Sequence, residues 1–129
     1  MTNYVDVNSA NWESEVSKSE ILTLVYFWHD ECPWCLRLNP IFIEITEGFR
    51  GKIKFVKLNI LESETNREMA TNLGVMGTPT MMFFCHGRST GQTVGFMTKE
   101  QLEQVLRDML QKYKTCLLQS TELKPFYVV

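Results

Sequence analysis

The sequence predicts an α/β fold in which a mixed central sheet carries helices on both faces. Strand-like and helix-like segments alternate along most of the chain, which is typical of parallel strands joined by helices. The last two strand-like segments are separated only by a short turn, which indicates an antiparallel hairpin. With 129 residues, the chain is long enough for one domain with a sizeable core.

Each element follows from its own pattern. Residues 21–28 form an apolar run of the length of a buried strand, and residues 33–49 repeat apolar side chains at helical spacing around Pro40, which should kink the helix. A capping box at residues 98–101 begins the last helix, which reaches Tyr113. The other expected elements are strand 3–7, a helix capped by Asn8 or Ser9 and ending near residue 17, strand 52–61, helix 64–73, strand 80–85, a turn at 86–89 and strand 90–95. Residues 1–113 are expected to form the domain, and residues 114–129 an extension docked on it.

Composition and charge narrow the class of protein. Thirteen basic and 15 acidic side chains give a formal net charge of −2. The sequence contains no basic patch of the kind that binds nucleic acid or an anionic membrane, so we expect neither partner. Residues 1–15 lack the basic and apolar regions of a secretory leader, and no apolar run approaches transmembrane length. Four cysteines in a chain of this size fit a reducing compartment, so we expect a cytoplasmic location.

The motif Cys32-Pro33-Trp34-Cys35 lies where the apolar strand gives way to a helix. Proline suits the first helical turn, where its missing N–H costs nothing. The two cysteines are three residues apart and are near neighbours on a helix surface, so their sulfurs can form a disulfide. The free amides and the dipole of the helix N-terminus favour a thiolate at Cys32. We therefore expect Cys32 to be the reactive sulfur, and Cys35 to be more buried and less acidic.

Two other interpretations of the motif are weaker. A structural zinc site needs four ligands, and the remaining candidates contain no second closely spaced pair: Cys85, Cys116, His29 and His86. A purely structural disulfide would close a very short loop and stabilise the fold little. The motif therefore predicts dithiol redox chemistry, with a redox-active Cys32–Cys35 disulfide, no metal and no bound cofactor.

The order of elements and several motifs resemble the thioredoxin family over about residues 3–113. The matching positions are Phe27-Trp28, both motif cysteines, Pro40, Lys57-Leu58-Asn59, Gly77-Thr78-Pro79-Thr80, Gly87 and Gly95. The resemblance implies the thioredoxin fold and a cis Thr78–Pro79 peptide bond facing the cysteines. It also implies a groove in which the Thr78 backbone pairs with a substrate chain, a form of strand addition. The implied groove residues are Trp28, Gly77, Thr78, Pro79, Gly95 and Phe96.

Four residues depart from the family pattern. Pro33-Trp34 replaces the usual Gly-Pro and is more similar to glutaredoxins and thiol oxidases, although the 31 residues before Cys32 fit the longer thioredoxin fold. Glu31 occupies the place of an aromatic contact residue. Tyr26 replaces the buried acid that takes the proton from the second cysteine in the family. Because a tyrosine titrates near pH 10, Tyr26 cannot act as a base at neutral pH, and we group it with Lys57 as the proton-transfer environment.

The resemblance implies an enzyme that reduces protein disulfides, with a role in electron transport and cell redox homeostasis. Cys32 would attack the substrate disulfide, Cys35 would resolve the mixed disulfide, and a separate reductase would supply electrons. Two alternatives stay open. Pro33-Trp34 suggests an oxidase or isomerase, and the extension suggests a non-enzymatic binding module with a redox-sensing latch.

The remaining side chains receive modest predictions. Trp34 is expected beside the sulfurs and exposed, and Trp28 in the core. Cys85 ends an apolar strand and is expected to be an inert core thiol. Cys116 lies in the extension, where it could be exposed, and His86 is expected in a turn.

Overall fold

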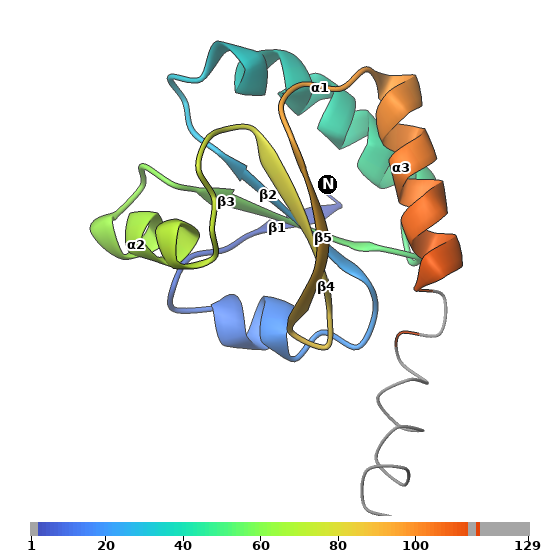
Figure 1. Cartoon of the computed structure of the whole chain (residues 1–129), viewed down its shortest axis with the longest axis horizontal. Helices are drawn as coiled ribbons and strands as arrows, with labels where there is room; N and C mark the ends of the chain where they lie inside the picture. The colour runs from blue at the N-terminus through green and yellow to red at the C-terminus, as the bar shows by residue number, and fades with distance from the viewer. Residues whose placement is uncertain (1–2, 114–115, 117–129) are drawn as a thin grey trace, which may run out of the picture.

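The computed structural model describes residues 3–113 and residue 116. A five-stranded sheet in the order β1-β3-β2-β4-β5 lies between helices (Figure 1). The strands are β1 (Tyr4–Asp6), β2 (Thr23–Trp28), β3 (Lys54–Asn59), β4 (Thr80–Cys85) and β5 (Arg88–Val94). The helices are α1 (Pro33–Gly48), α2 (Glu64–Asn72) and α3 (Lys99–Lys112), with a short π-helix at Glu13–Ser17. The expected mixed α/β fold is confirmed.

The sheet combines parallel and antiparallel pairing. β3 runs parallel to both β1 and β2, whereas β4 runs antiparallel to β2 and β5. Since β4 runs opposite to β2, the start of β4 lies beside the end of β2, where Phe27 pairs with Thr80. The segment before β4 and the segment after β2 therefore meet at the same end of the sheet.

Both faces of the sheet are covered. Leu24 and Tyr26 face a core shared with α1 and α3, whereas Val25 and Phe27 face a second core shared with α2 and the π-helix (Figure 1). Successive strand residues point to opposite faces. Because each face is buried, β2 consists of consecutive apolar side chains, which explains the apolar run in the sequence.

The helix starts agree with their capping residues. Cys32 is the N-cap of α1, with Pro33 at the first helical position. Ser63 caps α2 through the Asn66 amide, and the capping box of α3, from Thr98 to Gln101, is confirmed. Pro40 lies inside α1, and the kink expected there stays a prediction.

The first helix is capped by Asn8, as expected, although its regular part is a π-helix that begins only at Glu13. The Asn8 carbonyl accepts the helical hydrogen bond of the Trp12 amide at 3.0 Å, and the Asn8 side chain accepts one from the Ala10 amide at 2.8 Å. The Asn11 side chain in turn accepts a hydrogen bond from the Asn8 amide at 2.8 Å. These bonds satisfy amides of the first turn that have no partner within the helix.

The hairpin between β4 and β5 is tighter than expected. The predicted four-residue turn is a two-residue turn, His86-Gly87, and both residues have positive φ, 53° and 80°. Positive φ at both central positions matches the right-handed twist of the flanking strands. β5 consequently begins at Arg88 rather than at residue 90. The prediction that His86 lies in a turn is confirmed.

The prediction of an inert Cys85 thiol is wrong. Cys85 forms a disulfide with Cys116, and both residues are buried. The sequence could not show this pairing, because the two cysteines are 31 positions apart and meet only through the packing of α3. The rest of the expected docking of the extension concerns residues 114–115 and 117–129, which lie outside the described part of the chain. Within the described residues, no helix has the length and apolar character needed to cross a membrane.

A buried asparagine connects the end of β3 to α2. Asn66 is fully buried, and its side-chain amide donates to the Asn59 carbonyl at 3.0 Å and to the Glu62 carboxylate at 3.2 Å. Its side-chain oxygen accepts from the Ser9 amide at 3.3 Å. Asn66 therefore fixes three segments, and β3 ends there beside the end of β2, where Trp28 pairs with Asn59.

We predict that Asn66→Ala lowers the free energy of unfolding by about 1–3 kcal/mol, because it leaves buried backbone groups without partners. Asn72→Ala, at an exposed position on the same helix, is the matched control and should change stability by less than about 0.5 kcal/mol. Urea unfolding followed by circular dichroism measures both. Equal losses in the two variants would contradict the structural role of Asn66.

Candidate active site around Cys32 and Cys35

Three strands position the Cys32-Cys35 motif. The motif follows β2, and the pairing of Phe27 with Thr80 brings the Thr78–Pro79 segment alongside. On the far side of β4, the Gly95 amide donates to the Pro79 carbonyl at 2.8 Å. The sheet therefore gathers the expected groove residues around one end of β2.

Cys32 and Cys35 form a disulfide at the start of α1, with their Cα atoms 5.1 Å apart. The Cys35 amide donates a hydrogen bond to Cys32 Sγ at 3.2 Å. Cys32 is 6% exposed and Cys35 is fully buried, which confirms the expected difference in burial. After reduction, the amide and the helix N-terminus would stabilise a thiolate at Cys32.

An aromatic surface lies beside the disulfide. Trp34 is 52% exposed, as expected, and its ring centroid is 5.6 Å from that of Phe96. The Arg37 guanidinium lies 4.9 Å from the Trp34 ring centroid and covers part of it. Met76, directly before Gly77, is 98% exposed. The contact of Arg37 with Trp34 was not predicted from the sequence. Their three-residue spacing on the exposed face of α1 could have indicated it.

The segment from Gly77 to Thr80 is fixed by its own backbone geometry and by a hydrogen bond within it. The Thr78–Pro79 peptide bond is cis, Pro79 is buried, and Gly77 is exposed. The Thr80 hydroxyl donates to the Gly77 carbonyl at 2.6 Å, which tightens the turn before β4. Gly95 has φ of 97°, a conformation that a glycine adopts without steric cost, and it leads the chain to Phe96.

Lys57 is buried next to the site. Its ammonium group lies 4.1 Å from the Trp28 ring centroid, and Lys57 is only 6% exposed. Burial lowers the pKa of Lys57, and the charges of Asp6 and Asp30 partly oppose this shift. Trp28 is partly buried and packs against the core as expected, but its ring also covers this lysine.

Tyr26 connects β2 to α1 behind the disulfide. It is fully buried, and its hydroxyl lies 2.7 Å from Asn39 Oδ1 and 3.1 Å from the Cys35 carbonyl oxygen. Since the hydroxyl has one proton, it donates to one of these acceptors at a time. Burial raises the pKa of Tyr26 above the ordinary tyrosine value, so the group stays neutral at physiological pH. No functional role was predicted for Asn39, although it is a polar residue one turn after Cys35 and next to the buried Leu38.

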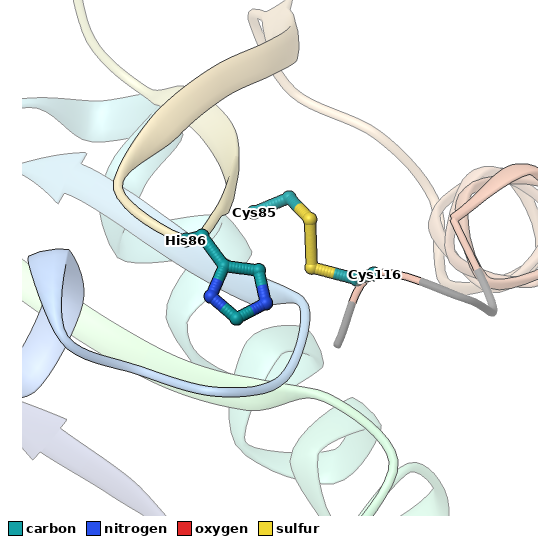
Figure 2. Close-up of side chains that lie close together, drawn as sticks. All are labelled: Cys85, His86 and Cys116. Atoms are coloured by element: carbon teal, nitrogen blue, oxygen red, sulfur yellow. A yellow bond between two sulfur atoms is a disulfide. The ribbon is translucent and has the colours of Figure 1, made fainter. Parts of the chain in front are cut away.

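The loop before Cys32 is shaped by the flanking polar residues. The Glu31 amide donates to His29 Nδ1 at 3.1 Å, and the Asn59 side chain donates to Asp30 at 3.4 Å. Glu31 is exposed, so the residue directly before Cys32 carries a charged group at the surface. The other cysteines lie away from this site, at the far end of β4, where Cys85, His86 and Cys116 form a separate cluster (Figure 2).

Comparison with known proteins agrees with this geometry. The Thioredoxin family model matches residues 3–108. The chain is 36% identical to a thioredoxin of Pseudomonas aeruginosa over 98 residues. These residues make up 76% of this chain and 88% of the relative. It is 33% identical over 110 residues to thioredoxin 1 of a Nostoc species, covering 85% of this chain and 100% of the relative. A Rickettsia bellii thioredoxin is 36% identical over 97 residues, which are 75% of this chain and 90% of the relative. The chain belongs to the thioredoxin family.

Proposed function

We propose that this thiol–disulfide oxidoreductase acts as a reductase of protein disulfides, with Cys32 as the attacking thiolate and Cys35 as the resolving thiol. The single observation that carries the assignment is the position of Cys32. It is the N-cap of α1, it accepts the Cys35 amide, and it is the more exposed of the two sulfurs. An attacking thiolate needs both stabilisation and access, whereas a resolving thiol needs only to reach the first sulfur.

The reaction transfers two electrons from the dithiol to the substrate. The Cys32 thiolate attacks one substrate sulfur, a mixed disulfide forms, and the other substrate sulfur leaves as a thiolate. Cys35 then loses its proton and attacks Cys32 Sγ, which restores the Cys32–Cys35 disulfide and releases the second substrate thiolate. A separate dithiol reductase must return two electrons to the pair.

The groove supports a protein substrate. An extended substrate segment would align with the backbone of Thr78, opposite the disulfide, and pair with it by main-chain hydrogen bonds. Trp34 and Phe96 offer an apolar surface on one side, and the exposed Met76 side chain adds to it before Gly77. We propose that Trp28 and Gly95 shape this groove.

The proton on Cys35 has no carboxylate to receive it at position 26. The neutral Tyr26 hydroxyl is bonded to Asn39 and to the Cys35 carbonyl, and its raised pKa prevents it from acting as a base. We infer that the leaving substrate thiolate, or water held near Lys57, accepts this proton. Resolution should therefore depend on pH more steeply than in a protein with a buried carboxylate.

We infer a cytoplasmic location, because a reductase must be recharged in a reducing compartment. No bound cofactor takes part in the proposed reaction, since the dithiol carries both electrons.

We predict that Cys35→Ser traps insulin chains as a stable mixed disulfide and that Cys32→Ser does not, because only Cys32 attacks the substrate. The parent protein, kept reduced by dithiothreitol, should reduce insulin faster than dithiothreitol alone. Non-reducing electrophoresis and turbidity measure the two outcomes. Equal trapping by the two variants would contradict the assignment of Cys32 as the attacking and Cys35 as the resolving cysteine. Absence of insulin reduction would favour the binding-module alternative.

A second prediction separates a reductase from an oxidase, the alternative favoured by Pro33-Trp34. We expect a reduction potential of roughly −270 to −200 mV, between those of thioredoxin and glutaredoxins. Replacing the dipeptide by Gly-Pro should lower it. Equilibration with glutathione buffers measures both proteins. A potential near −120 mV, typical of a strong oxidant, would indicate the oxidase.

A third prediction concerns Tyr26. Tyr26→Asp should accelerate resolution of a preformed Cys32 mixed disulfide at neutral pH, because a carboxylate can accept the Cys35 proton, and it should lower stability through its burial. Tyr26→Phe, which removes the hydroxyl without adding a base, is the matched control and should not accelerate the step. Single-turnover release followed by tryptophan fluorescence between about pH 6 and 9, where thiols begin to ionise, gives the rates. A flat profile in the parent protein would show that position 26 does not govern proton transfer.

A further inference from the structure

A second cluster of sulfur and nitrogen atoms lies at the far end of β4. Cys85 ends the strand, His86 begins the hairpin turn, and Cys116 follows α3. The two sulfurs and an imidazole nitrogen all lie within 4.8 Å of one another, and no other group of this kind occurs among residues 3–113 and 116. Figure 2 shows the His86 ring beside the Cys85–Cys116 disulfide. Two segments distant in the sequence, the end of β4 with its hairpin turn and the residue that follows α3, thus converge on one point.

The imidazole has an unused nitrogen. His86 Nε2 is buried and has no hydrogen-bond partner in the described part of the chain. A buried polar atom without a partner is costly, and such atoms in folded proteins call for an explanation. The neighbouring sulfurs are also buried, with Cys85 9% and Cys116 3% exposed. The cluster therefore contains three soft or borderline ligand atoms shielded from bulk water.

The convergence does not depend on the disulfide alone. The Tyr113 hydroxyl donates to the Thr90 carbonyl at 3.3 Å and joins the end of α3 to β5. The Cys116 amide donates to the Tyr113 carbonyl at 2.9 Å. When the disulfide is reduced, these bonds keep the Cys116 thiol near the hairpin.

The turn that carries His86 is also fixed. A Cβ atom at Gly87 would lie 3.2 Å from the Ser17 carbonyl oxygen, so the turn packs closely against the segment before β2. His86 has φ of 53°, in the left-handed region that asparagine, aspartate and histidine adopt more often than other non-glycine residues. The imidazole is therefore held at the sulfurs by a backbone that has little freedom to move.

We propose that the reduced form of this cluster binds a thiophilic divalent cation, Zn²⁺, through the thiolates of Cys85 and Cys116 and Nε2 of His86. Two thiolates and one imidazole form a known zinc ligand set, which leaves one coordination position for water. Zinc–sulfur bonds of about 2.3 Å in tetrahedral geometry separate the sulfurs by roughly 3.8 Å. Side-chain rotation can provide this separation, since the Cα atoms of the two cysteines are 5.9 Å apart.

The Cys85–Cys116 disulfide must be reduced before its sulfurs can bind a metal ion. A dithiol, such as the Cys32–Cys35 dithiol of a second molecule, gives two electrons and two protons to the Cys85–Cys116 disulfide and becomes a disulfide itself. The two resulting thiols then bind Zn²⁺ and release two protons. Oxidation of the two thiolates by a disulfide acceptor reverses the sequence and releases the cation. The cluster is thus a metal site that opens only when its own disulfide is reduced.

The test uses the full chain with Cys32→Ser and Cys35→Ser, so that the active-site thiols bind no metal. After reduction with a phosphine under argon, this protein should bind one equivalent of Zn²⁺ in competition with a chromophoric chelator. Co²⁺ as a second probe should give thiolate-to-metal charge-transfer absorption. The same protein in its disulfide form should bind neither ion at this site.

Three further variants on that background identify the ligands. Cys116→Ser should abolish tight binding, and His86→Asn should weaken it by about tenfold or more, since even loss of a group that only orients a ligand weakens affinity that much. His29→Asn, at the other histidine, is the matched control and should leave affinity unchanged. Asparagine tolerates the left-handed turn, so His86→Asn keeps the fold, which thermal unfolding checks. Binding below one equivalent in the reduced parent, or unchanged binding in His86→Asn or Cys116→Ser, would overturn the three-ligand site.

Discussion

The position of the active site depends on the antiparallel pairing of β2 with β4. β2 delivers the motif at its end, and β4 begins beside it, because Phe27 pairs with Thr80. A parallel pairing would have placed Pro79 at the opposite end of the sheet from Cys32. The bond from the Gly95 amide to the Pro79 carbonyl adds the third segment. Burial of β2 on both faces fixes this register, since a shift by one residue would exchange its two sets of core side chains.

Tyr26 links β2, behind the disulfide, to the helix that carries both cysteines. A carboxylate at this buried position would carry a charge close to Lys57 and could exchange protons with Cys35. The phenol instead completes the core, with its ring centroid 4.9 Å from that of Phe42, and its hydroxyl bonds to Asn39 and the Cys35 carbonyl. The helix that carries both cysteines is thereby fixed to β2 by a neutral group. In the proposed mechanism, Tyr26 therefore supplies no internal base, because burial raises its pKa.

Much of the fold and of this site followed from local sequence patterns. The Cys32-Cys35 motif, the strand before it and the capping box at Thr98 are short-range signals, and each was found where expected. The Asn39–Tyr26 bond and the Arg37–Trp34 contact depend on side-chain directions across packed elements, which periodicity does not specify. The Cys85–Cys116 pairing was missed for a further reason. It depends on where α3 ends relative to the hairpin, and sequence spacing carries no information about that distance.

The two cysteine pairs lie at opposite ends of β4. This strand has six residues from Thr80 to Cys85, which at about 3.3 Å per residue separates its ends by roughly 17 Å. The Cys32 thiolate therefore cannot attack the Cys85–Cys116 disulfide of its own chain, because exchange requires contact between sulfur atoms. Electrons can pass between the pairs only when two molecules meet, or when a third thiol carries them. The redox state of the second pair is consequently not coupled directly to the dithiol at the other end of β4 in the same chain.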